Sequence, residues 1–525
     1  MVIIMKGQKK NMTKVLNYKG HIRNRAALCA ELGVADTADR EATEKAVIAA
    51  AYDRFGKDMA AHLYGAFAFV LQSENGLFAM RDHFGIEPLY YAVAPDGELL
   101  IDTSLEGLFA GGKLEKALEE RMLPVYFTYA FPAGEYTFYR GVKKLLPGHM
   151  LSFDGKNLTV ERYFRPSFAV KEQRDEEEWM AMIDSTVETI MAEEYEDTVK
   201  SNGGAFLSSG VDSSCLVAAS AVKYACAVGY HEERFSELAG ARETAGILDR
   251  TLYERIVEPA EYFAAIDRLL VQMEQPLGDG SSAAFYLGSM AMKDHSTMCF
   301  SGEGNDEFWG GYYSYGNAER YASDIARPYR SCCYIGASYL LKNPEMSDLM
   351  DGVHEAIYAE TEDQTKLSRM MLTDILLYLD GNIYPNIAAM AKLCGLDIRM
   401  PFSDVRLFDI AARVPDELKL RTVGEERISK YIFRRASCKY LPEPVAFRKK
   451  IGFAVPIRFW LQEEKYHAPI RALTTGETAA KYLDTEAING LWDRYLAGED
   501  SLWRPLYTAY SFVKWYDAHF GGENR

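Results

Sequence analysis

Two short segments of this sequence combine small residues with groups that bind phosphate or carry charge. The first is residues 207–214, Leu-Ser-Ser-Gly-Val-Asp-Ser-Ser. Its small side chains let backbone N–H groups approach an anion such as pyrophosphate, and Ser213 and Ser214 are expected to open a helix whose N-terminus favours negative charge. Asp212 would repel bare phosphate, so its presence is best explained by a Mg²⁺ ion that bridges carboxylate and phosphate oxygens. A Ser/Gly turn that only caps a helix is the alternative.

The second segment is residues 301–311, Ser-Gly-Glu-Gly-Asn-Asp-Glu-Phe-Trp-Gly-Gly. It places three carboxylates, those of Glu303, Asp306 and Glu307, among four glycines. Clustered carboxylates repel one another unless a cation or a shared proton compensates. A solvated acidic turn is the alternative. Two such loops in one chain indicate metal-dependent nucleotide chemistry.

Several common catalytic motifs are missing from the sequence. The Gly-Lys pairs at 56–57, 112–113 and 155–156 lack a following Ser or Thr, so no G-x-x-x-x-G-K-[ST] loop occurs, which disfavours an ordinary kinase or NTPase. The histidines are isolated, with no H-E-x-x-H or comparable spacing, and are interpreted as structural. We expect no intrinsic transition-metal site.

The length, net charge and composition of the chain exclude several classes of protein. A chain of 525 residues exceeds the size of a single hydrophobic core, so two domains are expected. The net charge of -17 argues against nucleic acid or an anionic membrane as a partner. No apolar run is long enough to span a bilayer, and the opening Met-Val-Ile-Ile-Met is too short for a signal-peptide core before Lys6, Lys9 and Lys10. The eight cysteines show no C-x-x-C pairing, which predicts reduced thiols and a cytoplasmic location.

The pattern of apolar runs changes along the chain. Up to about residue 168, short strands such as 65–71 and 88–93 surround a helix at roughly 43–55, which predicts a mixed α+β domain. The charged stretch 171–178 is either a linker or the exposed start of a helix, and we place the domain boundary there.

Beyond the boundary, brief apolar runs precede Gly- or Ser-rich turns and long helical segments. The runs are 205–207, 225–230 and 297–300. This rhythm predicts βαβ units and a parallel sheet, in which ligands bind beyond the carboxyl ends of the strands. Both loops described above lie at such positions. From about Tyr313 onward the pattern is mostly helical.

Together these residues resemble the asparagine synthetase family of the glutamine-hydrolysing type. Residues 208–214 are similar to the family's S-G-G-x-D-S-S, with Ser209 adding a side chain where the family has glycine at the tightest part of the cradle. Residues 301–312 are similar to S-G-E-G-x-D-E-x-x-G-G-Y, 395–404 to G-x-E-x-R-x-P-F-x-D, and 448–456 to R-x-K-x-G-F-x-V-P. The four matches occur in the family's order.

The N-terminal region resembles the family's glutaminase domain at residues 65–69, 81–91 and 146–149. Family glutaminases use a mature N-terminal cysteine as nucleophile, whereas the first cysteine here is Cys29. An upstream start codon would explain that difference. It would not explain three further departures, in which Lys19 and His21 replace the glutamine-contacting Asn and Glu and Ser73 stands near the glutamine-binding aspartate. We therefore expect glutamine hydrolysis to be lost.

The resemblance implies a fold for each region. Residues 1–168 are expected to form an α+β glutaminase-like sandwich of the N-terminal-nucleophile type, a degenerate type 2 glutamine amidotransferase domain. Residues 175–525 are expected to form an α/β, parallel-sheet, adenine-nucleotide α-hydrolase-like synthetase domain with a helical C-terminal part. Arg399 and Asp404 are expected to organise the fold, and Asp397 replaces the family's usual Glu.

The resemblance also implies ATP and Mg²⁺ as cofactors. Asp212 and Asp306 would hold Mg²⁺, Glu303 would assist the attack of the amine, and Lys450, next to Lys449, would stabilise negative charge. The residues expected to contact the nucleotide are Leu207, Ser208, Ser209, Gly210, Asp212, Ser213, Ser214, Val228, Gly229, Tyr230, Ser301, Gly302 and Gly304.

Three functions follow from this resemblance. The first is adenylation of a carboxylate, with aspartate as the default, and its transfer to ammonia or an amine with release of AMP and pyrophosphate; intact Glu303 favours it. The second is a ligase that forms a β-lactam or macrolactam, like relatives that keep a glutaminase-like domain without its cysteine. The third is a non-catalytic regulatory homologue, which the retained acidic residues and Lys450 disfavour. A homodimer is compatible with each of them.

Overall fold

The computed structural model describes residues 13–317, 332–344, 357 and 359–521 of the chain. The opening segment with its three lysines lies outside these residues. The chain forms two compact units, one of Met1–Glu119 with Gly134–Ser167 and one of Glu120–Ala133 with Phe168–Arg525. Within the described parts, no helix has the length and apolar character needed to cross a bilayer.

The first unit is built on two antiparallel sheets. The larger sheet has the order β1-β2-β3-β7-β8, and its strands are Lys14–Ile22, Gly65–Ser73, Gly76–Arg81, His149–Phe153 and Leu158–Arg162. The smaller has the order β5-β4-β6, with β4 at Tyr90–Val93, β5 at Leu99–Asp102 and β6 at Val142–Lys144. A short helix, α3 (Leu105–Phe109), follows β5.

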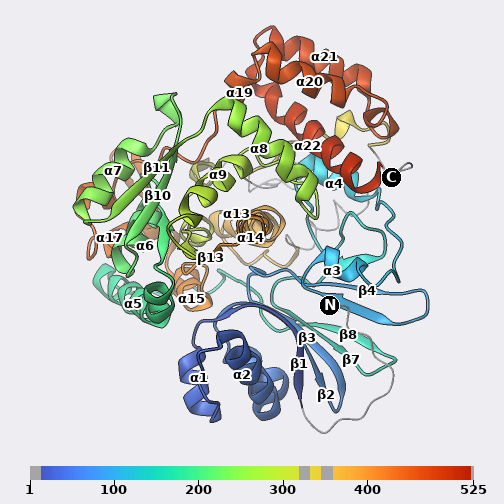
Figure 1. Ribbon diagram of the computed structural model, residues 1–525. Helices are drawn as coiled ribbons and strands as arrows, with labels where there is room; N and C mark the ends of the chain where they lie inside the picture. The colour runs from blue at the N-terminus through green and yellow to red at the C-terminus, as the bar shows by residue number, and fades with distance from the viewer. Residues whose placement is uncertain (1–12, 318–331, 345–356, 358, 522–525) are drawn as a thin grey trace. The chain divides into compact units, whose positions relative to one another are not determined.

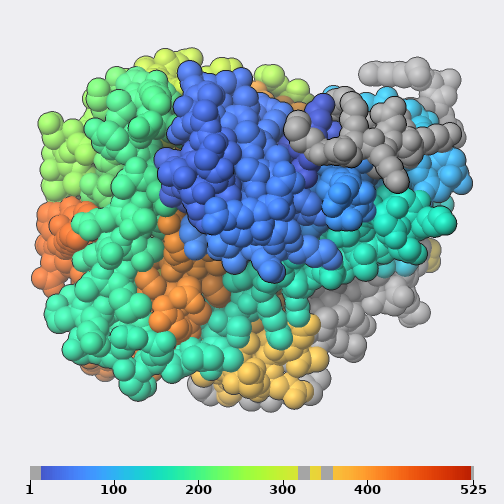
Figure 2. Space-filling model, turned by 90° about the horizontal axis from the view of Figure 1, so that it is seen from below, coloured from blue at the N-terminus to red at the C-terminus, as the bar shows by residue number. Residues whose placement is uncertain are grey.

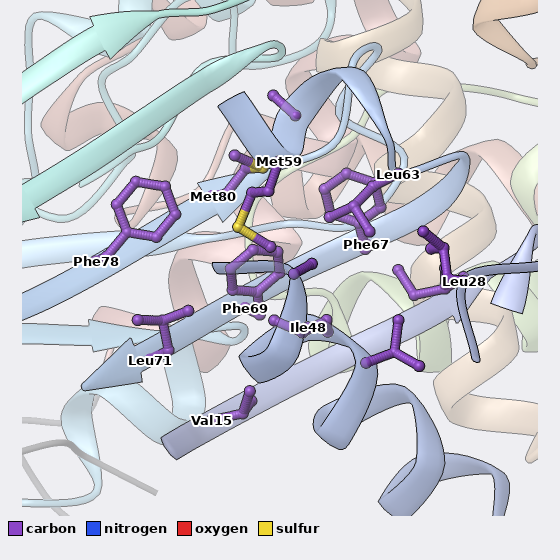
Figure 3. Close-up of a cluster of buried hydrophobic side chains, with 14 of the residues drawn as sticks. Val15, Leu28, Ile48, Met59, Leu63, Phe67, Phe69, Leu71, Phe78 and Met80 are labelled. Carbon is purple, nitrogen blue, oxygen red and sulfur yellow. The ribbon is translucent and has the colours of Figure 1, made fainter. Parts of the chain in front are cut away.

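Alternation along β2 divides the core of this unit between two faces. Phe67, Phe69 and Leu71 pack in one hydrophobic cluster with residues of α1 (Arg25–Leu32) and α2 (Arg40–Phe55), as Figure 3 shows. Their neighbours in the strand belong to a second cluster, which includes residues of the smaller sheet. Successive side chains of a strand point to opposite faces, so one strand serves both clusters. Figure 2 shows the exposed residues of this N-terminal part in blue.

The second unit contains a five-stranded parallel sheet, as the sequence predicts. Its order is β11-β10-β9-β12-β13, with β9 at Gly204–Phe206, β10 at Tyr224–Gly229, β11 at Thr251–Ile256, β12 at Met298–Phe300 and β13 at Asp397–Arg399. In register, Phe300 of β12 lies opposite Ala205 of β9, so these two strands end side by side. The two loops singled out by the sequence therefore start from adjacent strands.

Helices before and between these strands, and one after β12, pack around the sheet (Figure 1). They are α5 (Glu176–Lys200), α6 (Val211–Ala219), α7 (Leu238–Ile247), α8 (Pro259–Gln272), α9 (Ser282–Lys293) and α10 (Asn305–Trp309). The charged stretch at 171–178 contains the start of α5, because the Asp175 side chain accepts a hydrogen bond from the backbone N–H of Glu178 and caps the helix.

The remaining described residues of this unit are largely helical and include a hairpin of β14 (Leu420–Val423) and β15 (Glu426–Ser429). Its longer helices are α13 (Lys366–Thr373), α14 (Tyr384–Cys394), α15 (Val405–Arg413), α17 (Tyr431–Ser437), α20 (Glu464–Thr474), α21 (Thr485–Leu496) and α22 (Trp503–Phe520). A π-helical segment, Asp374–Ile383, joins α13 to α14. The helix α4 (Met122–Tyr129) also belongs here, and its Tyr126 hydroxyl donates to the Thr508 carbonyl of α22 at 3.2 Å.

Candidate active site

The loops after β9 and β12 face one cavity of about 170 Å³. Because the two strands are parallel neighbours, both loops leave the same edge of the sheet. The residues expected from the sequence that line this cavity are Leu207, Ser208, Gly210, Asp212, Ser213, Val228, Ser301, Gly302, Glu303, Asp306 and Lys450.

The loop at 207–214 forms a closed turn at the start of α6. Gly210 is the N-cap residue of that helix, and the Ser213 hydroxyl accepts a 3.0 Å hydrogen bond from the backbone N–H of Ser208. A Cβ at Gly302 would lie only 3.3 Å from the Asp212 Cβ, so glycine allows the acidic loop to approach closely. The first-turn N–H groups of α6 are thereby left near the cavity, where they suit an anion.

The Ser209 side chain does not line the cavity but contacts Glu237, which does. Its hydroxyl donates a 2.7 Å hydrogen bond to Glu237, which is the N-cap residue of α7, and Ser209 is not among the residues that line the cavity. The expected extra side chain in the cradle is therefore turned toward α7. A Cβ at Gly240 would lie 2.6 Å from the Ser209 Cβ, so a glycine in α7 makes room for the serine.

Lys430 lies between the two aspartates that the sequence assigns to Mg²⁺. Its Nζ is 2.5 Å from Asp212 Oδ2 and 2.8 Å from Asp306 Oδ1, and its side chain is 2% exposed. Asn305 donates to the other oxygen of Asp212 at 2.5 Å. Lys430 itself has a left-handed backbone, with φ of 56°, at the N-cap of α17. No sequence motif pointed to this residue.

Lys450 completes a charge-balanced cluster. Its ammonium lies 2.6 Å from Asp306 Oδ2 and 5.6 Å from the centre of the Tyr312 ring. Burial alone would lower the pKa of Lys450, but the carboxylates of Asp306 and Asp212 outweigh it and raise that pKa above its ordinary value. Burial opposes ionisation of Asp306 too, yet Lys430 and Lys450 hold its pKa below the ordinary value. Two carboxylates and two ammonium groups thus compensate one another.

Glu303 has the properties of a base that works near neutral pH. Burial first, and then the nearby Asp306 carboxylate, raise its pKa to about 7, while Lys450 opposes that rise. The backbone carbonyl of Glu303 accepts a 2.9 Å hydrogen bond from the Ser403 hydroxyl. The next residue, Gly304, has φ of 89°, and a Cβ there would lie 2.3 Å from the Ser403 Oγ. The loop that aims Glu303 therefore requires glycine at this point.

Glu307 is a buried residue that stabilises the acidic loop and does not face the cavity. It is 1% exposed and accepts a 2.6 Å hydrogen bond from the Tyr312 hydroxyl. Burial, together with the charge of Asp306, raises its pKa well above the ordinary value. Of the three carboxylates of the acidic loop, only Glu303 and Asp306 line the cavity.

Some residues expected at the nucleotide do not line the cavity. They are Ser209, Ser214, Gly229, Tyr230 and Gly304. Tyr230 instead packs edge-on against Trp460, with ring centres 5.8 Å apart. The cavity walls that were not among the expected nucleotide contacts are Phe206, Cys226, Glu237, Phe285 and Phe453. The apolar side chains among them carry no local sequence signal of a binding role.

Arg399 and Asp404, expected to organise the fold, do so by ion pairs and a helix cap. Arg399 is 5% exposed and contacts Glu194 at 2.6 Å and Asp397 at 2.7 Å. Asp404 accepts a hydrogen bond from the backbone N–H of Arg406 and caps α15.

The residues that depart from the glutaminase pattern all lie in the first unit. Lys19 pairs with Glu87 at 2.9 Å, and His21 is 5% exposed. Cys29 is buried in α1, where burial raises the pKa of its thiol. Ser73 accepts a hydrogen bond from the Asn75 N–H within the β2–β3 turn. A buried thiol of raised pKa is a poor nucleophile, so Cys29 is a core residue.

Comparison with known proteins gives two family matches and several relatives that match over most of their length. The asparagine synthase family model matches residues 198–517, and the glutamine amidotransferase domain model matches residues 5–164. Asparagine synthetase [glutamine-hydrolyzing] 1 of Bacillus subtilis is 26% identical over 95% of this chain and 84% of its own length. A putative asparagine synthetase of Mycobacterium bovis is 26% identical over 96% and 84%. Asparagine synthetase B of Escherichia coli is 27% identical over 86% and 72%.

Proposed function

The chain belongs to the asparagine synthase family, and we propose that it adenylates a carboxylate with ATP and transfers the acyl group to ammonia or an amine, releasing AMP and pyrophosphate. It is thus a carbon–nitrogen ligase with an N-terminal glutamine amidotransferase domain. Aspartate is the default acid. The observation that carries the proposal is that Asp212 and Asp306, from two separate loops, meet around one cation in a single cavity. We also assign the first unit to the N-terminal-nucleophile type and the second to the adenine-nucleotide α-hydrolase type.

The phosphate loop is the site proposed for the pyrophosphate of ATP. Ser208, Gly210 and Ser213 line the cavity at the N-terminus of α6, which presents N–H donors and a partial positive charge. Such donors stabilise the leaving pyrophosphate as its charge develops. The apolar walls given by Phe206, Val228 and Phe285 suit the adenine ring.

The donor set at the two aspartates fits Mg²⁺. One cation, the Lys430 ammonium, already contacts an oxygen of each carboxylate, so a position exists from which both can be reached. Carboxylate and phosphate oxygens are the hard ligands that Mg²⁺ prefers, at about 2.0–2.1 Å. Asp212 and Asp306 would hold Mg²⁺, which when bound neutralises phosphate charge. Lys430 would have to shift or share these oxygens.

Amide formation then needs two displacements. In the first, an oxygen of the acid bonds to the α-phosphorus and the bond to pyrophosphate breaks. In the second, the nitrogen lone pair bonds to the acyl carbon, the carbon–oxygen bond to AMP breaks, and a proton leaves the nitrogen. Glu303, with its pKa of about 7, is suited to accept that proton. Lys450 stabilises negative charge in either step.

We propose that glutamine does not supply the nitrogen. The positions similar to the family's glutamine contacts hold Lys19 and His21, and Lys19 is occupied by an ion pair with Glu87. Cys29 is buried in a hydrophobic core. The amine therefore reaches the synthetase unit from solution.

ATP–pyrophosphate exchange across a panel of carboxylic acids with Mg²⁺ tests the proposal. Exchange stimulated by aspartate supports the default substrate, and exchange only with a larger acid or a peptide supports a lactam-forming or peptide-cyclising ligase. Asp306→Asn should abolish exchange, whereas Asp294→Asn, an exposed carboxylate at the end of α9, should retain it. Absence of exchange with every acid would overturn the proposal and favour a non-catalytic homologue.

A further inference from the structure

The second unit holds another pocket, of about 270 Å³, that shares one wall residue with the candidate active site. The shared residue is Phe453, which lines both spaces. The pocket's polar wall residues include Asp279, Asn382 and Arg504, and its aromatic ones are Tyr129, Phe131, Phe453 and Trp503. Part of the motif at 448–456 contributes to its wall, but neither Asp279 nor Asn382 was singled out in the sequence.

Asp279 gives the pocket a carboxylate without a cationic partner. Its Oδ1 accepts hydrogen bonds from the Ser281 N–H at 2.8 Å and the Ser281 hydroxyl at 2.7 Å, and its Oδ2 accepts from Asn382 at 2.7 Å. Within the described parts of the chain, no Lys, Arg or His forms an ion pair with it. A carboxylate held only by neutral donors has no countercharge from the protein beside it, so its site suits a cation on a ligand.

Asn382 adds a second acceptor. It is 2% exposed, and its Oδ1 has no hydrogen-bond partner among the described residues. The amide nitrogen of Asn382 donates to Asp279 Oδ2, and this hydrogen bond sets the orientation in which Oδ1 is left without a donor. A buried acceptor left without a donor is unfavourable, so a ligand that brings a donor is favoured. Asn382 also lies in the π-helical segment Asp374–Ile383, a conformation frequent at functional sites.

The volume of the pocket and the residues that line it indicate which kind of hydrogen-bond donor it can bind. A water molecule, close in size to ammonia, occupies about 30 Å³ of liquid. The pocket, at about 270 Å³, is far larger than ammonia requires. Its aromatic walls suit an apolar body, and aromatic faces attract a neighbouring cation. Arg504 donates to the Cys333 carbonyl at 3.3 Å and forms no ion pair with the described residues. Its guanidinium could therefore also donate to a carbonyl or carboxylate on the same ligand.

We propose that this pocket binds the nitrogen-donating substrate of the ligase as the ammonium form of an organic primary amine. Asp279 and Asn382 accept hydrogen bonds from the ammonium group, and the aromatic residues contact the organic body. When the ammonium leaves the pocket it loses one proton to water, and the neutral amine, now with a free lone pair, reaches the acyl-adenylate past Phe453. This inference rests on the proposed function and narrows it, because ammonia would leave most of the pocket unfilled.

Calorimetric titration of the full-length protein with 2-phenylethylamine and with 2-phenylethanol tests the binding site without any turnover. The amine should bind at least about tenfold more tightly than the alcohol, because only the amine carries a charge to pair with Asp279. Asp279→Asn should remove that preference, whereas Asp294→Asn, with the same change of charge outside the pocket, should keep it. Equal binding of the two compounds to the unaltered protein would overturn the proposal even if the Asp279 variant failed to fold.

A kinetic comparison separates the amine from the acid. With an acid that supports ATP–pyrophosphate exchange, Asp279→Asn should raise the KM for the amine in amide formation at least about tenfold more than the KM for the acid in exchange. The opposite order would assign the pocket to the acid and contradict the inference. If no acid supports exchange, the proposed function fails, but the calorimetric preference for the amine still reports on the pocket.

Discussion

The Lys430 ammonium lies 2.5 Å from a carboxylate oxygen of Asp212, although the two residues are 218 positions apart in the sequence. The same ammonium contacts Asp306 at 2.8 Å. Lys430 thus holds the phosphate loop and the acidic loop together at the point where Mg²⁺ is proposed to bind. Its removal should affect stability and metal binding in opposite directions.

Replacing Lys430 by Met should lower the thermal midpoint of the protein in EDTA. Removing one partner from a buried charge cluster costs about 3–5 kcal/mol, because the remaining charges stay buried without compensation. Addition of Mg²⁺ and ATP should raise the midpoint more in the variant than in the unaltered protein, because the cation position is vacant and the repulsion of the carboxylates is relieved. Differential scanning fluorimetry with and without Mg²⁺ and ATP measures both effects.

Lys439→Met is the matched control for this variant. Lys439 pairs with Glu188 at the surface, where an ion pair contributes about 0–1 kcal/mol, so its loss should hardly change the midpoint. A Lys430→Met protein that is as stable as the unaltered one in EDTA would show that the lysine does not compensate the aspartates.

Replacing Glu303 by Gln should separate the two half-reactions. The glutamine side chain keeps the size of Glu303 but cannot accept a proton, so amide formation should slow by about 10²–10⁴-fold. Exchange of pyrophosphate into ATP, which precedes the attack of the amine, should fall much less. A parallel loss of both activities would assign Glu303 to adenylation or to folding instead of to the second step.

The pH dependence of amide formation should report the ionisation of Glu303. The base must be ionised, so activity should fall as the pH drops below the pKa of about 7 and level off above it. Lys450→Gln removes an ammonium that lowers this pKa, so the midpoint of the acid limb should move to higher pH. The measurement is the pH at the midpoint of the acid limb, not the maximal rate of amide formation. If Lys450→Gln left that midpoint unchanged, Glu303 would be excluded as the titrating group.

The sequence predicted the elements that carry the loops but not all the groups that meet there. Alternating and continuous apolar runs identified β2, β10 and β12, and parallel topology explains why Asp212 and Asp306 face one cavity. Lys430 belongs to no recognisable motif, because its place beside the aspartates depends on how α17 packs against α5 and α6. The sequence also could not show that Ser209 turns toward Glu237, because a rotamer is chosen by its neighbours.

The sequence also did not predict that Asp279 and Asn382 line a common pocket. Its walls come from segments as distant as α4 and α22, and only tertiary packing brings them together. Single polar residues in helices or turns are far more often structural than functional, so neither Asp279 nor Asn382 indicated a site on its own. The signal appears only when an acceptor is found buried without a donor.

Glutamine should not serve as nitrogen donor. Incubation of the full-length protein with glutamine, ATP, Mg²⁺ and a supporting acid should release no glutamate, because Lys19 and His21 occupy the positions similar to the family's glutamine contacts. Asparagine synthetase B [glutamine-hydrolyzing] of E. coli is the positive control. Glutamate formed above the rate seen without protein would contradict the expectation and restore a function to the first unit.

A matched pair of glycine variants in α7 should test how the phosphate loop is positioned. In Gly240→Ala the new Cβ would lie 2.6 Å from the Ser209 Cβ, so the loop must shift, and the KM for ATP in the exchange assay should rise. Gly246→Ala is on the same helix, and its Cβ would meet nothing within 4 Å. That change should leave the KM unaltered and stabilise the helix by up to about 1 kcal/mol, since alanine is the better helix former. Equal KM values for the two variants would mean that Ser209 does not fix the geometry of the loop.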